Sequence, residues 1–149
     1  MHFDPFKIST AEHDADIVFI THAHYDHLDP KSVEKISGRN TVFVAPSSMA
    51  QEMRKVTGNA ELVLMAPGDI KNISDITIQA IPAYNRLKPF HPKRNGWLGY
   101  IVTMDGVSYY VAGDTDAVSI MGLMNDKGHD VQLLIDEDVL KEEKIIAKR

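Results

Sequence analysis

The sequence predicts one mixed α/β domain over residues 1–149, in which helices cover a sheet core. Two observations support this fold class. Short apolar runs such as IVFI and TVFVA alternate with segments of helical periodicity. The hydrophobic and charged fractions, 44% and 25%, are those of an ordinary globular chain, and a chain of this length can build a core without cross-links. The sequence shows no internal repeat and no interdomain linker.

Composition excludes several classes of function. The chain has no cysteine, so disulfides and cysteine nucleophiles are excluded, and any metal must be held by nitrogen and oxygen atoms. The formal net charge of −5 argues against a general nucleic-acid-binding surface. No apolar run approaches the ~20 residues needed to span a membrane, and the N-terminus lacks the features of a signal peptide. We therefore expect a cytoplasmic protein without a membrane partner.

The first predicted strand and helix are separated by a short polar segment. Residues 16–20 (DIVFI) are expected to form a buried strand, because every residue after the aspartate is apolar. Residues 29–37 are expected to form a short helix, with Asp29 as the N-cap and Pro30 at the first helical position. Gly38 follows and is expected to end this helix.

A second strand and helix follow in the same order. Residues 41–45 (TVFVA) predict a strand from their β-branched and apolar side chains. Residues 46–58 predict a helix, because the methionines and a valine recur on one face. Ser47 or Ser48 is expected to cap its first turn, and Gly58 to close its last one.

The second half of the chain is predicted to be rich in strands. A strand followed by a turn is expected within 60–69, and period-two alternation predicts a half-buried strand over 75–83. A polar, locally basic loop spans 84–96. Two apolar runs on either side of Asp105-Gly106 predict a hairpin with a type I′ turn. The last two predicted elements are a strand over 131–135 and a charged helix over 136–149.

A cluster of histidines and aspartates follows the first predicted strand. His22, His24, Asp26 and His27 form the pattern His-x-His-x-Asp-His. Residues two apart in an extended segment point to the same side, so the first two histidines can reach one metal ion. The turn into the next helix can direct the aspartate and the last histidine to a second point nearby, and such ligands suit zinc, manganese or iron. Scattered surface histidines and a single structural metal are the two alternative interpretations.

This cluster resembles the signature of the metallo-β-lactamase superfamily. IPAYN, the basic loop and GWLGYIV are together similar to the middle segment of its general metal-dependent hydrolase branch. YYVAGDTD (109–116) is similar to the strand and loop that carry the family's bridging aspartate, and FDPF (3–6) resembles the strand end before the signature. The resemblance implies an α/β/β/α sandwich, here expected to be incomplete at the N- and C-termini.

The resemblance also implies a site for two divalent metal ions, with zinc expected first and manganese or iron as alternatives. His22 and His24 would bind one ion, Asp26 and His27 the second, and Asp114 would bridge them. Asp26 and Asp114 are accordingly the predicted catalytic residues. Asp114 ends an apolar strand, which fits this role, although an aspartate there can also serve as a helix N-cap.

Two positions depart from the family pattern. The third histidine of the first metal site normally follows the central strand, where Tyr84 and Asn85 stand in this sequence. His91 is the nearest replacement, and its alternative role is that of an ordinary surface histidine. His129 lies in a turn-like segment and is not expected to complete the second site. Asp4 can accept a hydrogen bond from a ligating histidine, or it can simply form an Asp-Pro turn.

The predicted function is hydrolysis of an ester, a phosphoester or a cyclic amide or lactone by metal-activated water. The predicted site keeps a net positive charge, which favours a small anionic substrate. The alternative is a remnant of the same fold that binds metal but has weak or no activity, because the usual opening strands and completing histidines are missing. Missing strands would expose sheet edges, so we also expect a homodimer.

Overall fold

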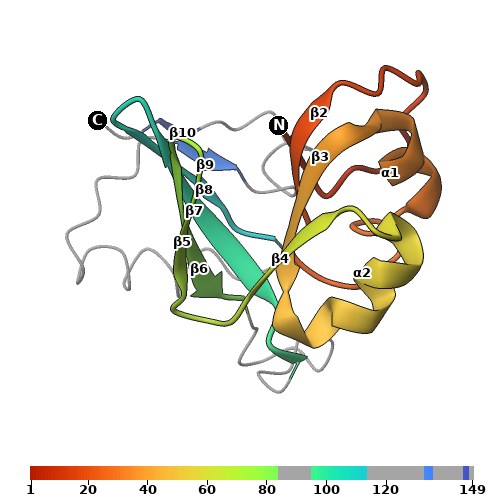
Figure 1. Cartoon of the computed structure of the whole chain (residues 1–149). Helices are drawn as coiled ribbons and strands as arrows, with labels where there is room; N and C mark the ends of the chain where they lie inside the picture. Colours follow the sequence, from red (N-terminus) through yellow and green to blue (C-terminus); the bar gives the residue numbers. More distant parts are fainter. Residues whose placement is uncertain (84–94, 114–132, 136–145, 148–149) are drawn as a thin grey trace. The chain divides into compact units, whose positions relative to one another are not determined.

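A computed structural model describes residues 1–83, 95–113, 133–135 and 146–147 of the chain (Figure 1). The chain divides into two compact units, Met1–Ala66 and Pro67–Arg149. Each unit contains its own sheet, and the helices described lie in the first. The chain is thus a mixed α/β protein with two sheets, as predicted. In the part of the chain that the structure describes, no helix is long and apolar enough to cross a membrane.

The first unit is built on a four-stranded parallel sheet in the order β1-β2-β3-β4. Its strands are β1 (His2–Phe3), β2 (Ala15–Phe19), β3 (Ser37–Pro46) and β4 (Glu61–Met65). Strands buried on both faces are uninterrupted apolar runs, and Val18, Phe19 and Val44 are accordingly inaccessible to solvent. The strands predicted at 16–20 and 41–45 are confirmed as β2 and β3.

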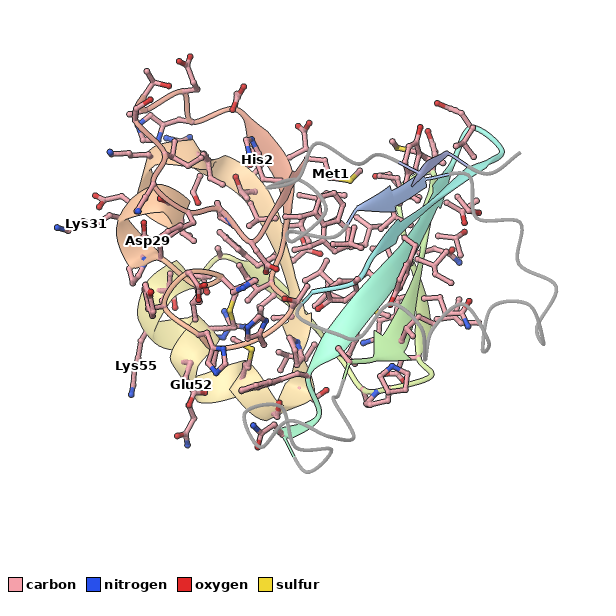
Figure 2. All side chains as sticks on the ribbon, turned by 180° about the vertical axis from the view of Figure 1, so that it is seen from behind. Met1, His2, Asp29, Lys31, Glu52 and Lys55 are labelled. Atoms are coloured by element: carbon pink, nitrogen blue, oxygen red, sulfur yellow. The ribbon has the colours of Figure 1, made fainter. Side chains whose placement is uncertain are left out.

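Helices cover this sheet on one face (Figure 1). They are α1 (Pro30–Ile36), the single turn η1 (Ser47–Met49) and α2 (Ala50–Thr57). The exposed side chains of Glu52 and Lys55 project outward from α2 (Figure 2). As predicted, α1 has Asp29 as its N-cap, whose carboxylate accepts hydrogen bonds from the amide of Lys31 at 3.3 Å and the hydroxyl of Ser32 at 2.6 Å.

Two details of the predicted helix ends are wrong. Gly38 does not end α1, because the chain enters β3 at Ser37. Gly38 is needed for a different reason: a Cβ there would lie 2.8 Å from the carbonyl oxygen of His13. Neither η1 nor α2 has a side-chain cap, so the predicted capping by Ser47 or Ser48 is not found.

Gly58 does close α2 as predicted. Its φ of 59° is a left-handed conformation that glycine adopts without steric cost. The amide of Gly58 donates to the carbonyl of Arg54 at 3.0 Å, which satisfies one of the last free carbonyl groups of the helix.

The second unit contains a six-stranded sheet in the order β10-β9-β8-β7-β6-β5, in which only the β8–β9 pair is parallel. Its strands are β5 (Ile70–Ile73), β6 (Ile76–Pro82), β7 (Leu98–Met104), β8 (Val107–Val111), β9 (Leu133–Ile135) and β10 (Ile146–Ala147). The hairpin between β7 and β8 is confirmed. Asp105 and Gly106, with φ values of 51° and 74°, have the two positive φ angles of a type I′ turn.

Two strands of this sheet were not expected. β5 lies at an exposed edge, where Ile70 is 62% accessible. Its two middle residues are polar, so the sequence lacks the apolar alternation that indicates a strand. Ile146–Ala147 forms β10, which pairs antiparallel with β9, where a helix was predicted. The other residues of that predicted helix lie outside the part of the chain that the structure describes.

Candidate metal centre

The candidate centre lies where the first two strands of the parallel sheet end. Asp4 directly follows β1, and segment 21–27 begins just beyond β2. Because β1 and β2 are parallel, their carboxyl ends lie at the same edge of the sheet. The amide of Asp4 donates to the carbonyl of Phe19 at 2.9 Å and continues this pairing. Strand pairing therefore brings Asp4 beside the histidine segment.

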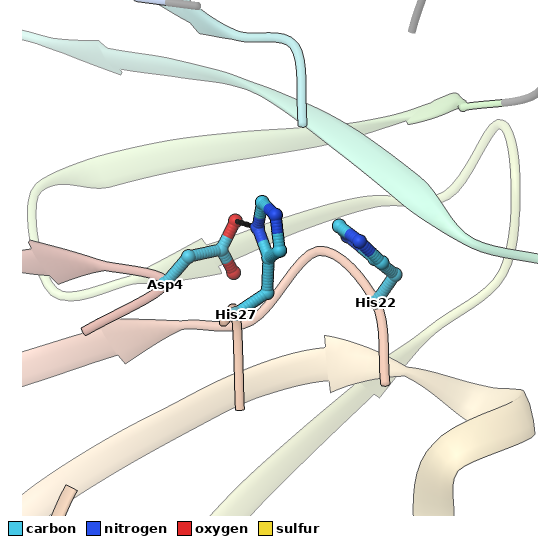
Figure 3. Close-up of side chains that lie close together, drawn as sticks. All are labelled: Asp4, His22 and His27. Atoms are coloured by element: carbon cyan, nitrogen blue, oxygen red, sulfur yellow. Dashed lines mark hydrogen bonds and ion pairs between the residues drawn. The ribbon is translucent and has the colours of Figure 1, made fainter. Parts of the chain in front are cut away.

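The buried carboxylate of Asp4 is the centre of a hydrogen-bond network. Its Oδ1 accepts from the amide of Thr21 at 2.8 Å. Its Oδ2 accepts from the hydroxyl of Thr21 at 2.6 Å and contacts Nδ1 of His27 at 2.9 Å (Figure 3). Asp4 also has a φ of 42°, a left-handed conformation that costs L-residues about 1–2 kcal/mol. Such backbone strain is typical of functional sites and accompanies the carboxylate's placement here.

His22 and His24 direct two ring nitrogens toward each other. Nε2 of His22 lies 3.1 Å from Nδ1 of His24, and the two rings are nearly perpendicular, with an interplanar angle of 79°. Ring nitrogens that bind one tetrahedral zinc ion at 2.0–2.1 Å lie about 3.3 Å apart. The separation in this structure is close to that value, so one cation can be held between the two rings.

Asp26 and His27 form a second pair next to the first. Nε2 of His27, a fully buried residue, lies 3.8 Å from Oδ2 of Asp26. The amides of His27 and Leu28 both donate to the carbonyl of His24, at 3.0 and 2.9 Å, and this tight turn folds the pair back toward the sheet. The ring centroids of His27 and His22 are 3.8 Å apart, so one ring of each pair lies beside a ring of the other, and Figure 3 shows these two rings side by side.

This set of side chains suits a divalent cation. Asp4, His22 and His27 each offer a ligand atom, and these atoms lie within 4.8 Å of one another. Both oxygens of Asp4 already accept hydrogen bonds, which fits an orienting role better than direct ligation. Asp26 has its side chain 36% exposed, and its Oδ2 lies 3.8 Å from Nε2 of His27, which suits a direct ligand. Three imidazoles with carboxylates provide nitrogen and oxygen ligands for zinc, manganese or iron.

The structure brings together four of the predicted metal ligands, namely His22, His24, Asp26 and His27. The two others, His91 and Asp114, lie outside the described residues, as do Tyr84, Asn85 and His129. Their roles stay predictions. Of the two interpretations of Asp4, the structure favours the hydrogen-bond acceptor. Thr21 was not singled out from the sequence, although a hydroxyl directly before the first histidine was a visible signal.

Comparison with protein families gives one match that spans nearly the whole chain. The family model described as "Beta-lactamase superfamily domain" matches residues 1–146. A metal-dependent hydrolase of Thermococcus kodakarensis is 31% identical over 131 residues, which cover 83% of this chain and 57% of the relative. A metal-dependent hydrolase of Archaeoglobus fulgidus is 30% identical over 146 residues, covering 88% of this chain and 61% of the relative. The chain thus spans about three fifths of the length of these curated relatives.

Solved structures agree with this match. A crystal structure assigned as a metal-dependent hydrolase from Parabacteroides distasonis has a TM-score of 0.66 and 31% identity, and covers 89% of this chain and 58% of that one. A diiron β-hydroxylase from Streptomyces venezuelae has a TM-score of 0.63 at 15% identity, with 81% of this chain and 25% of that one covered. At that identity the second likeness concerns the fold alone.

Proposed function

Since this chain belongs to the β-lactamase superfamily, we propose that it is a metal-dependent hydrolase of an ester, a phosphoester or a cyclic amide or lactone. The observation that carries the proposal is the convergence of His22 Nε2 and His24 Nδ1 at 3.1 Å, beside the pair formed by Asp26 and His27. Imidazoles arranged around one point at the end of a buried strand are what metal-dependent hydrolysis needs.

In this proposal the chain holds two divalent cations, zinc first among the candidates. His22 and His24 would hold one, with His91 as an additional ligand. Asp26 and His27 would hold the second, and Asp114 would be a ligand of both. Such cations, when bound, supply hydroxide at neutral pH and stabilise the negative charge that develops on the substrate. Asp114 would orient the attacking water.

The proposed substrate is a small anion. The carboxylates of Asp26 and Asp114 neutralise only part of the charge of two divalent cations, so the site remains attractive to anions. Tyr25, between two of the proposed ligands in the sequence, is 79% exposed, and the ring of Phe6 packs edge-on against it with centroids 6.0 Å apart. The ammonium group of Lys7 lies 5.0 Å from the centre of the Phe6 ring. These three side chains offer an apolar surface and a positive charge for such a substrate.

We also propose that the protein forms a homodimer in solution. Among the described residues β5 is the last strand of its sheet, with Ile70 62% accessible, and an exposed edge strand can pair with a second copy.

Metal content and hydrolysis, measured on the same preparation, test the proposed function. We expect about two zinc ions per chain and turnover of at least one substrate in a screen of p-nitrophenyl esters, bis-p-nitrophenyl phosphate and lactones. His24→Ala and Asp114→Ala should each lower the metal content and abolish turnover.

His2→Ala is the matched control for histidine substitution. His2 lies outside the cluster, 3.8 Å from the carboxylate of Asp14, and its replacement should change neither metal content nor turnover. One loosely held ion and no turnover on any substrate would instead identify the metal-binding remnant. Turnover that persists in chelator-treated protein would contradict the proposal outright.

A further inference from the structure

We propose that the Asp4 carboxylate sets the ring tautomers of two histidines, contacting His27 directly and His22 through the hydroxyl of Thr21. Thr21 is then a positioning residue of the metal centre. This inference rests on the proposed metal centre, but it concerns the protonation of the rings in the metal-free protein. It can therefore be tested without any assumption about the reaction or the substrate.

The direct contact fixes His27. An ionised carboxylate can only accept hydrogen bonds, so Nδ1 of His27 must donate to Oδ2 of Asp4 across the 2.9 Å that separate them. A neutral imidazole has one donor and one acceptor nitrogen. Nε2 of His27 therefore carries the lone pair, and it is this nitrogen that lies on the side of Asp26. The ring is thereby held in the form that can bind a cation through Nε2.

The indirect contact, through the hydroxyl of Thr21, fixes the tautomer of His22 by the same donor and acceptor rule. The hydroxyl of Thr21 has a single hydrogen, and the 2.6 Å contact with Oδ2 of Asp4 requires that hydrogen. The oxygen of Thr21 can then only accept in its 2.9 Å contact with His22, so Nδ1 of His22 must donate. Nε2 of His22 is left with the lone pair, and this nitrogen faces His24.

The location of the network makes this control effective. Asp4, Thr21, His22 and His27 are all buried, with exposures of 6%, 0%, 2% and 0%. Water cannot readily replace any of the three hydrogen bonds, and buried donors left unsatisfied are costly. The amide of Thr21 also donates to Oδ1 of Asp4 at 2.8 Å, which holds the carboxylate in the orientation that serves both partners.

The two arms of the network predict different effects of substitution. Thr21→Val keeps the shape of the side chain but removes the hydroxyl, so it should release only His22. Asp4→Asn keeps the shape of the side chain but alters both the contact with His27 and the contact with the hydroxyl of Thr21, so it should disturb His22 and His27 together. Loss of an orienting contact of this kind typically lowers metal affinity about 10- to 100-fold.

Ring nitrogen NMR of the metal-free protein tests the tautomers directly. In wild-type protein, long-range ¹H–¹⁵N spectra should show Nδ1 protonated and Nε2 bare for both His22 and His27. In Thr21→Val the signals of His22 should move toward a mixture of the two tautomers, whereas those of His27 should stay. Finding the Nε2-protonated form at either ring in wild-type protein would overturn the inference, and this measurement needs no variant to fold.

Zinc titration against a chromophoric chelator supplies the second readout. Thr21→Val should weaken one zinc-binding step about 10- to 100-fold, and Asp4→Asn both steps, while Thr21→Ser should restore wild-type binding. Thr41→Val is the matched control, because Thr41 is also buried and its hydroxyl also makes two hydrogen bonds, to Ala15 and Gly38.

Unchanged zinc binding in Thr21→Val would overturn the inference, as would an equal loss in Thr41→Val. If the protein shows the expected tautomers and zinc affinities but no hydrolytic activity, the inference is supported and the proposed function is refuted. The two conclusions therefore fail separately.

Discussion

Replacing Asp4 with alanine removes the acceptor of three buried hydrogen bonds at once: those from the amide of Thr21, the hydroxyl of Thr21 and the ring of His27. A buried donor left without its partner costs about 1–3 kcal/mol. The lower end of that range applies, because the hydroxyl can turn toward His22. Alanine bears the same cost of about 1–2 kcal/mol at a φ of 42° as the aspartate does, so the backbone adds no further loss. We therefore expect Asp4→Ala to lower the free energy of unfolding of the metal-free protein by about 2–3 kcal/mol.

Asp4→Gly tests the backbone cost at this position separately. Glycine adopts the left-handed conformation without the steric cost, so it should be about 1–2 kcal/mol more stable than the alanine variant. The loss in Asp4→Ala measures the hydrogen bonds, because alanine and aspartate bear the same backbone cost, and the gain of glycine over alanine measures that cost.

Urea unfolding in the presence of a chelator, followed by far-UV circular dichroism, is the assay. Asp29→Ala is the matched control, because it removes a carboxylate that also accepts hydrogen bonds, but one that is only half-buried and caps a helix. Loss of such a cap costs about 1 kcal/mol. Should Asp4→Ala lose no more stability than Asp29→Ala, the buried network would not stabilise this unit as argued.

Further predictions concern pH, packing, metal removal and assembly. The hydrogen bond from the hydroxyl of Ser32 holds the pKa of Asp29 below its ordinary value of 3.8. The stabilisation of the folded protein that comes from this lowered pKa is fully present above pH 3.8 and is lost as the pH falls through the lower pKa of the folded state. When the free energy of unfolding is measured against pH, wild type should show this loss and Asp29→Asn should not. Gly99→Ala should destabilise the β7–β8 hairpin, because a Cβ there would lie 2.7 Å from the carbonyl oxygen of Val111; a melting temperature equal to wild type would contradict this. Zinc at a hundred times its dissociation constant should stabilise the protein by about 2.7 kcal/mol, and chelation should reverse the gain; a thermal melt that does not respond to zinc would argue against the centre. Light scattering at micromolar concentration should give the mass of a dimer, and a monomeric mass would refute the proposed homodimer.

Local features of the fold were predictable because they depend on neighbouring residues. The apolar run of β2, the N-cap Asp29 and the type I′ turn at Asp105-Gly106 each follow from side-chain chemistry over a few positions. The predictions that failed depended on distant residues. Gly38 is required by a carbonyl from residue 13, and β10 exists through its pairing with β9.

The candidate site divides in the same way. The spacing of His22, His24, Asp26 and His27 within six residues marked them as ligands, because so short a segment keeps its side chains close together in any fold. Nothing in the spacing could show that Asp4, seventeen residues before Thr21, would accept its hydrogen bonds. That contact exists because β1 and β2 pair in parallel and end at the same edge of the sheet. The sequence alone thus marked the side chains that we propose as cation ligands, whereas the tertiary structure decides which ring nitrogen of His22 and of His27 is available, since only strand pairing brings the buried carboxylate to these two rings.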